Sequence, residues 1–296
     1  DLRFESGEQL QNVIQQIVAD CNRVVNEASP IVDARLKNGS RVNVVLNPVA
    51  LNGPIVTIRR FPDKPVMMED LISYGSVTKE VCEWLGKLVR AKYNIMISGG
   101  TGSGKTTFLN ALSYYIPEEE RIITIEDNAE LQILGLPNLV RMEKRNANVD
   151  GCLEITIRDL IKTSLRMRPD RIIVGEVRGG EAFDMMQCLN TGHDGSMSTG
   201  HANSSEDMLS RLENMILMGM ELPLTAIRQQ IASGVDIIVH LGRLRDRTRK
   251  VLEITEVMGF EEGRIRLRPL YQFVETGEDA AGRVLGVLQK KGDLSY

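Results

Sequence analysis

The stretch Gly99-Gly-Thr-Gly-Ser-Gly-Lys105-Thr106 matches the pattern G-x-x-x-x-G-K-[ST] of a phosphate-binding loop. It follows the apolar run 94–98 and precedes the helix-like stretch 106–115, which is the order of strand, loop and helix that such a loop requires. Glycines let backbone N–H groups close around phosphate oxygens, and the start of a helix adds positive potential. Lys105 is expected to reach the β- and γ-phosphates, and the Thr106 hydroxyl to bind Mg²⁺. The stretch therefore predicts a site for a nucleoside triphosphate.

Apolar runs alternate with helix-like stretches on both sides of this loop. Such alternation is typical of a parallel sheet covered by helices on both faces, so an α/β fold is predicted. The expected strands are 94–98, 121–125, 171–174, 196–199 and 235–239, and the expected helices are 106–115, 156–167, 181–189, 205–218 and 224–233. From residue 250 onward the helical pattern stops, and the stretches 251–258 and 264–273 predict an antiparallel hairpin.

The residues before this region predict a separate, small α+β unit. Apolar positions three and four residues apart predict an amphipathic helix over 8–27. Alternation of period two then predicts a hairpin of strands 31–37 and 41–46, and a third strand over 55–60. The proline-containing stretch 61–65 is expected to be a linker that acts as a hinge. The expected domains are 1–65 and 66–296, and we expect the natural protein to continue before residue 1.

Acidic residues stand where two of the apolar runs end. In a doubly wound sheet the functional residues gather at the carboxyl ends of strands, so Glu126 and Glu176 are expected beside the phosphate loop. Glu176 is expected to polarise the attacking water or to hold the water shell of Mg²⁺, and Glu126 is a second carboxylate for these roles. The alternative for each is a surface residue without a catalytic role. Asp127 either contributes to the site or caps a following helix, in which Glu130 would lie one step further.

Two of the three histidines, His193 and His201, bracket the expected strand 196–199. If that strand is extended at about 3.3 Å per residue, they lie too far apart to bind one metal ion. His201 is either a sensor of the γ-phosphate or a structural residue, His193 is expected to face a neighbour, and His240 is expected to be structural. The expected nucleotide contacts are Gly100, Thr101, Gly102, Ser103, Gly104, Lys105, Thr106, Thr107 and His201.

Composition limits the class of protein. The 296 residues contain 36 Lys+Arg against 40 Asp+Glu, a net charge of −4, and this mildly acidic balance argues against bulk nucleic-acid binding. No apolar run approaches the roughly 18 residues of a membrane-spanning helix. The four cysteines, at 21, 82, 152 and 188, include no C-x-x-C pair, which predicts neither a zinc site nor a disulfide framework and favours the cytoplasm.

Four motifs in this order resemble those of the secretion ATPase superfamily of type II and type IV secretion and type IV pili. The matching stretches are 99–106 for the Walker A loop, 124–130 for the Asp box, 171–176 for the atypical Walker B motif and 191–201 for the His box. Residues 164–178, 39–61 and 275–286 most resemble the CpaF/TadA-type ATPase of tight-adherence (Tad) pilus assembly. The resemblance covers nearly the whole chain, although the tetracysteine zinc insertion of the type II secretion branch is missing.

This resemblance implies a RecA-like P-loop core, ATP and Mg²⁺ as cofactors, and a homo-hexameric ring. It implies a motor that hydrolyses ATP to assemble a type IV (Tad-like) pilus or a related secretion system. Arg41 and Arg59 of the small domain would approach the phosphates, with Arg60 as the fallback. The implied catalytic residues are Glu176, Glu126, Lys105, Arg41 and Arg59, and the implied metal ligands are Thr106 and Glu126, partly through water. The implied partner is an inner-membrane platform protein, with peripheral association at the cytoplasmic face and no nucleic acid.

The alternative is a nucleic-acid translocase on the same RecA-like core. Its best feature is the basic alternation over 243–250, which is expected to put several arginines on one face of a strand. A solvated edge or a subunit interface is the other interpretation of this stretch. A small-molecule kinase is disfavoured, because no stretch resembles an acceptor-binding lid with clustered arginines.

Overall fold

The structure, a computed structural model, describes residues 3–61, 64–146 and 153–295. Contacts divide the chain into two units, Asp1–Lys64 and Pro65–Tyr296. Two residues of the expected linker, 62 and 63, and one of the four cysteines, Cys152, lie outside the described residues. The other three cysteines, Cys21, Cys82 and Cys188, are free thiols.

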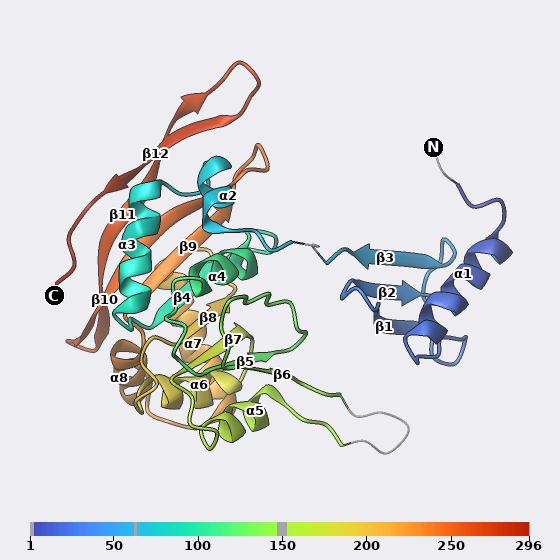
Figure 1. Cartoon of the computed structure of the whole chain (residues 1–296), viewed down its shortest axis with the longest axis horizontal. Helices are drawn as coiled ribbons and strands as arrows, with labels where there is room; N and C mark the ends of the chain where they lie inside the picture. Colours follow the sequence, from blue (N-terminus) through green and yellow to red (C-terminus); the bar gives the residue numbers. More distant parts are fainter. Residues whose placement is uncertain (1–2, 62–63, 147–152, 296) are drawn as a thin grey trace. The chain divides into compact units, whose positions relative to one another are not determined.

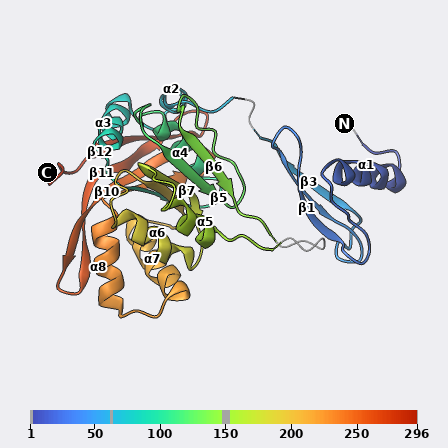
Figure 2. The ribbon, with the colours of Figure 1, turned by 60° about the horizontal axis from the view of Figure 1, so that its bottom comes forward.

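The first unit is a three-stranded antiparallel sheet with one helix packed on one face (Figure 2). Its elements are α1 (Gly7–Asp20), β1 (Ile31–Arg35), β2 (Arg41–Val45) and β3 (Ile55–Arg59), with the strands in the order β1-β2-β3. Ile14 and Val18 of the helix are fully buried against Val42 and Val44 of the central strand. The expected hairpin and third strand are therefore present, each slightly shorter than predicted.

The helix predicted over 8–27 is wrong beyond Asp20. Asn22 adopts a left-handed conformation, with φ of 52°, and turns the chain out of the helix. The apolar spacing continues past this point because Val25 is buried in the same core from irregular chain, whereas Val24 is 73% exposed. Hydrophobic periodicity alone does not mark the end of a helix when the next loop also packs on the core.

The second unit is built on a nine-stranded sheet in the order β12-β11-β10-β9-β4-β8-β7-β5-β6 (Figure 1). The strands are β4 (Ile95–Gly99), β5 (Ile122–Glu126), β6 (Leu139–Glu143), β7 (Arg171–Val177), β8 (Met197–Gly200), β9 (Ile237–Arg243), β10 (Arg249–Glu261), β11 (Arg264–Glu278) and β12 (Val284–Lys290). The helices are α2 (Met68–Ser73), α3 (Lys79–Arg90), α4 (Lys105–Ser113), α5 (Ile157–Ser164), α6 (Glu181–Leu189), α7 (Ser205–Gly219) and α8 (Leu224–Gly234). The strands from β9 to β6 run parallel.

Alternate residues of the parallel strands enter two different hydrophobic clusters, one on each face of the sheet. Ile95 and Ile97 of β4 pack with residues of α2, α3 and α4, whereas Met96 between them packs with residues of α5 to α8. Ile237 and Ile238 of β9 divide in the same way. The predicted α/β fold, a parallel sheet covered on both faces, is confirmed.

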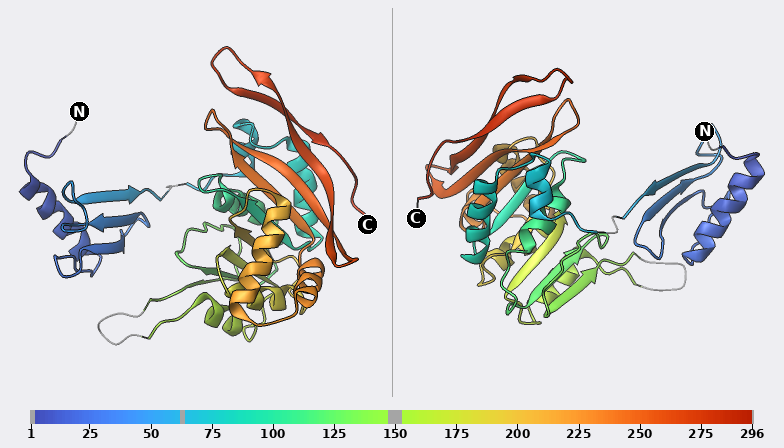
Figure 3. Two further views of the ribbon diagram at one scale, coloured as in Figure 1. Left: turned by 180° about the vertical axis from the view of Figure 1, so that it is seen from behind. Right: turned by 45° about the horizontal axis from the view of Figure 1, so that its top comes forward.

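Beyond β9 the sheet continues with antiparallel strands, which Figure 3 shows in orange and red. The hairpin predicted at the end of the chain is present as β10 and β11, and β12 adds a further strand. Strands β6 and β12 and helices α2 and α3 had no counterpart in the sequence analysis. The edge strand β6 was missed because its residues are only half-buried or exposed and carry no continuous apolar run.

The basic stretch over 243–250 is not a strand face, which corrects the feature that favoured a translocase. β9 ends at Arg243 and β10 begins at Arg249, so a turn separates the arginines. Arg247 in this turn has φ of 68°, and Thr248 donates two hydrogen bonds to Asp246. The alternation of charges therefore belongs to a hairpin and not to one continuous strand.

A buried arginine joins four segments at the amino-terminal edge of the parallel strands. Arg171, at the start of β7, is fully buried and donates from two nitrogens to Glu120, at 2.5 and 2.9 Å. It also donates to the carbonyl oxygens of Val89 (2.7 Å) and Gly195 (3.2 Å). These four hydrogen bonds compensate the guanidinium for the hydration that burial removes.

Candidate active site

The phosphate loop connects β4 to α4, as predicted. Gly102 and Gly104 have φ of 73° and 95°, in the left-handed region that favours glycine, and Gly104 is the residue that precedes α4. Ser103 donates from its hydroxyl to the Gly100 carbonyl at 2.9 Å and holds the loop closed. The other residues predicted to contact the nucleotide lie in or next to this loop. Thr101 lies within it, and Thr106 and Thr107 lie in the first turn of α4.

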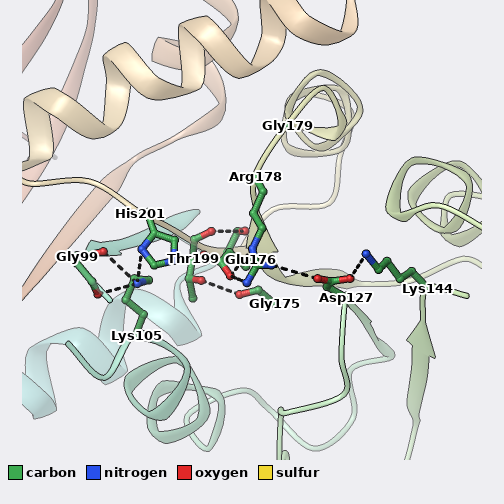
Figure 4. A network of polar contacts seen from close by, with 12 residues as sticks. Gly99, Lys105, Asp127, Lys144, Gly175, Glu176, Arg178, Gly179, Thr199 and His201 are labelled. Atoms are coloured by element: carbon green, nitrogen blue, oxygen red, sulfur yellow. Dashed lines mark hydrogen bonds and ion pairs between the residues drawn. The ribbon is translucent and has the colours of Figure 1, made fainter. Parts of the chain in front are cut away.

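Lys105 points back into the loop (Figure 4). Its ammonium donates to the carbonyl oxygens of Gly99 and Gly100, each at 3.0 Å, and lies 3.4 Å from Nδ1 of His201. The residue is only 8% exposed, and burial lowers the pKa of Lys105 while the Glu176 carboxylate acts to raise it. Contact of this cation with the phosphates stays a prediction.

His201 links Lys105 to the candidate catalytic carboxylate. His201 follows the last residue of β8, and its Nε2 lies 2.6 Å from Oε1 of Glu176 (Figure 4). Thr199 of β8 donates to the carbonyl of Gly175 at 2.7 Å. Burial lowers the pKa of His201, and the Lys105 ammonium lowers it further. The structure thus brings together three of the predicted residues, from the carboxyl ends of β8 and β7 and from the phosphate loop.

The other side of Glu176 is held by a residue that the sequence analysis did not single out. Arg178 donates from Nε to Oε2 of Glu176 at 2.8 Å and from a terminal nitrogen to Asp127 at 3.2 Å (Figure 4). Asp127 also pairs with Lys144. Asp127 caps no helix, because the described residues that follow it are irregular chain up to β6. Asp127 therefore lies between two cations, Arg178 and Lys144, and the spacing of residues in the sequence could not show this arrangement.

Glu126 has a different environment from the one expected. It ends β5 and is 3% exposed, and its Oε1 accepts the backbone N–H groups of Glu130 (2.7 Å) and Leu131 (2.8 Å). Burial raises the pKa of Glu126 to about 7, although these N–H donors and Arg141 act to lower it. Glu130 follows in irregular chain rather than one step along a helix. Glu126 therefore supports the loop after β5.

Glu126 also supplies the observation that bears on Mg²⁺. Its second oxygen, Oε2, is buried and has no hydrogen-bond partner among the described residues. An ion-bound water could satisfy that oxygen, and hydroxyl and carboxylate oxygens are ligands that Mg²⁺ accepts. The residues present, Thr106 in the first turn of α4 and Glu126 at the end of β5, fit such an ion.

The arginines of the first unit form a row across its sheet. Arg41 of β2 is paired in register with Arg59 of β3 on one side and with Arg35 of β1 on the other. Residues paired in this way share a face of an antiparallel sheet. Arg35 was missed because the register of the hairpin had to be known first, whereas Arg60 follows β3. The role of these arginines at the phosphates stays a prediction.

The two remaining histidines have neighbours outside this arrangement. His193 lies before β8, with Nδ1 3.3 Å from the carbonyl oxygen of Cys188. His240 is buried in β9, where its Nδ1 lies 2.9 Å from the Ser98 hydroxyl. The contacts of His240 agree with the structural role that the sequence analysis gave it.

The fold and the site define a class of protein. A phosphate loop follows a buried strand of a parallel sheet, its lysine lies inside the loop, and a glutamate ends a strand beside it. These are the parts of a P-loop ATPase, in which catalysis consists mostly of positioning and charge stabilisation.

Known proteins place the chain within that class. The family of type II/IV secretion system proteins matches residues 1–280. The chain belongs to this family and is one of its ATPases.

Individual relatives cover most of the chain. The type IV secretion system protein VirB11 of Bartonella henselae is 32% identical over 291 residues, covering 84% of this chain and 80% of that one. The conjugal transfer protein TrbB of Rhizobium radiobacter is 30% identical over 266 residues, covering 89% and 79%. The crystal structure of the VirB11 ATPase from the Brucella suis type IV secretion system, in complex with sulphate, superposes with a TM-score of 0.54 at 30% identity, covering 85% and 83%. The RecA-like core is confirmed by this similarity.

Proposed function

We propose that this protein is an ATP-hydrolysing motor that powers assembly of a type IV (Tad-like) pilus or of a related secretion system. The observation that carries the proposal is the continuous line of contacts from Lys105 through His201 to Glu176. It connects the group that binds phosphate to a carboxylate that can take a proton. Family membership supports the biological setting, and the resemblance of 164–178 to the Tad branch supports the particular machine.

The residues of the chain divide the work of hydrolysis. The loop amides and Lys105 bind the β- and γ-phosphates, for which Lys105 must exchange its bonds to Gly99 and Gly100. Mg²⁺, held by the Thr106 hydroxyl with Glu126 acting through water, would supply charge neutralisation on the phosphate oxygens. Glu176 then accepts the proton of the attacking water. His201 positions Glu176, because its Nε2 lies 2.6 Å from the carboxylate.

The resemblance supports a homo-hexamer in which Arg41 and Arg59 supply positive charge where the transition state develops negative charge. An inner-membrane platform protein is the proposed partner, with peripheral association at the cytoplasmic face. None of the helices in the described residues combines the length and the hydrophobicity needed to cross a bilayer. Purification of the tagged natural protein from membranes of piliated cells, followed by identification of the co-purified membrane protein, tests the partner.

Replacement of Lys105 tests the ATPase itself. Lys105→Ala is expected to abolish phosphate release and to weaken nucleotide binding greatly, because it removes the charge that faces the β- and γ-phosphates. Steady-state phosphate release and equilibrium titration with ATP measure the two effects. Lys79→Ala, an exposed lysine of α3, is the matched control. Hydrolysis by Lys105→Ala at the rate of the control would contradict the proposed function.

A further inference from the structure

The hairpin between β9 and β10 returns the chain to the phosphate loop. β9 pairs with β4, the strand that leads into the loop, and Gly99 is in register with Leu241. β10 pairs with β9 in turn, so its first residue, Arg249, lies opposite Arg243. The C-terminal part of the chain thus places a cation near the loop.

Arg249 contacts the loop from outside. Its Nε donates to the carbonyl oxygen of Gly102 at 2.8 Å. Its Cδ lies 3.4 Å from the position that a Cβ on Gly104 would take, so the side chain passes along both left-handed glycines. A guanidinium has five N–H donors, and this contact uses one of them.

The bond to Gly102 determines where the next amide points. In a trans peptide the carbonyl and the following N–H point in opposite directions. Because Arg249 holds the Gly102 carbonyl outward, the N–H of Ser103 turns inward, and it donates to Gly100 O at 3.3 Å. That same oxygen accepts a bond from Lys105. Arg249 therefore orients an amide that shares its acceptor, the Gly100 carbonyl, with the Lys105 ammonium.

The hairpin that carries Arg249 is itself anchored. The adjacent Lys250 donates from its ammonium to the carbonyl of Gly75 at 2.7 Å, and the N–H of Val251 donates to Ser76 at 2.9 Å. On the turn side, Asp246 accepts the N–H of Val284 at 2.8 Å, which ties the turn to β12. The hairpin is thus anchored on both sides of Arg249.

We propose that Arg249 is a positioning residue of the nucleotide site, which fixes the Gly102–Ser103 peptide and couples binding of a nucleoside di- or triphosphate to the β9–β10 hairpin. The inference rests on the proposed function, because it assumes that the loop binds such a nucleotide. It assigns the basic stretch over 243–250 a role within the ATPase.

The test compares Arg249→Ala, Arg249→Lys and the control Arg247→Asn with the unchanged protein. Arg247→Asn removes a positive charge from the same hairpin and keeps a residue that tolerates left-handed φ. Arg249→Ala is expected to raise the Kd of a fluorescent ADP and the KM for ATP about five- to tenfold, with kcat changed less than about threefold, as for loss of one charge-assisted hydrogen bond. Arg249→Lys is expected to recover most of the affinity, because lysine can donate to the same carbonyl.

Hydrogen exchange measures the coupling. ADP is expected to slow exchange of the amides in 244–251 in the unchanged protein, and this protection is expected to be lost in Arg249→Ala. Equal thermal unfolding midpoints without nucleotide show that each variant is folded. A Kd of Arg249→Ala within twofold of Arg247→Asn, or retained protection of 244–251, would overturn the inference alone. An unchanged protein that binds no nucleotide would overturn the proposed function as well.

Discussion

The carboxyl ends of β5 and β7 are neighbouring regions of one sheet, and each carries a glutamate at the place where chemistry is expected. At the end of β5, Glu126 is 3% exposed and bound by two backbone N–H groups. At the end of β7, the side chain of Glu176 is 17% exposed and lies between Arg178 and His201. Backbone N–H groups hold a carboxylate in one position, whereas a charged side chain can rotate away and leave the carboxylate to another partner.

From this difference we propose separate roles for the two carboxylates. Glu126 holds the chain that follows β5, and its pKa of about 7 reflects burial. Glu176 is linked to Lys105 through His201, and its other oxygen accepts hydrogen bonds from an exposed arginine, Arg178. A general base must accept a proton and then give it up, so the more accessible carboxylate is the better candidate.

Glu176→Gln tests this assignment with the largest expected effect. The amide cannot take a proton from water, so kcat is expected to fall on the order of 10⁴-fold while ATP binding is kept. Glu126→Gln is the matched variant and is expected to lower kcat by no more than about tenfold, as for loss of a water-mediated contact. Phosphate release and ATP titration on both variants give the two quantities. If Glu176→Gln hydrolyses ATP at the unchanged rate, the base is Glu126 instead.

Arg41→Ala and Arg59→Ala test whether ATP hydrolysis with Glu176 as the base also needs positive charge from the first unit. Each is expected to cut kcat on the order of 10³-fold, because a cation at the developing charge lowers the barrier. ATP affinity is expected to change less than about tenfold, or about 1.4 kcal/mol, and lysine to rescue poorly because it lacks the planar fork. Calorimetric titration is measured beside phosphate release. A variant that binds ATP a hundredfold more weakly yet turns over normally at saturation would make these arginines ground-state ligands.

Glu126 also predicts a pH dependence of stability. Its pKa is raised from 4.5 to about 7, so the folded protein binds this proton more tightly than the unfolded chain does. The stabilisation is therefore fully present below about pH 4.5 and is lost as the pH rises through about 7, on the order of 3 kcal/mol. Glu126→Gln is expected to remove this dependence. Urea unfolding from pH 5 to 8, with EDTA and without nucleotide, measures it against the exposed control Glu118→Gln, and parallel curves for wild type and Glu126→Gln would contradict it.

The positions of both glutamates were predictable, because buried parallel strands appear as apolar runs and functional residues follow them. Their surroundings were not. The irregular chain after Glu126 has no periodicity, so the two amides that bind this carboxylate could not be foreseen. Arg178 lies beyond the end of its motif, and only the structure shows that it reaches both Glu176 and Asp127.

Register explains the other omissions. The pairing of Arg35 with Arg41 can be predicted only when the turn between their strands is known. Arg249 contacts Gly102 only because β4, β9 and β10 pair side by side. The basic stretch containing Arg247 alternates like a strand, yet a left-handed residue makes it a turn. Local pattern predicts which elements exist, whereas contacts between distant segments depend on how those elements pair.

The buried pair of Arg171 and Glu120 is expected to affect the amount of folded protein in a cell and not the rate at which each molecule turns over. Four segments meet at this guanidinium, on the edge of the sheet opposite the phosphate loop. Loss of the Glu120 carboxylate would leave a buried cation without its partner, at a cost of about 3–5 kcal/mol. That is a large part of the total stability of a typical domain. Inherited changes at this edge are therefore expected to lower the amount of this ATPase through degradation, while each folded molecule keeps its normal turnover rate.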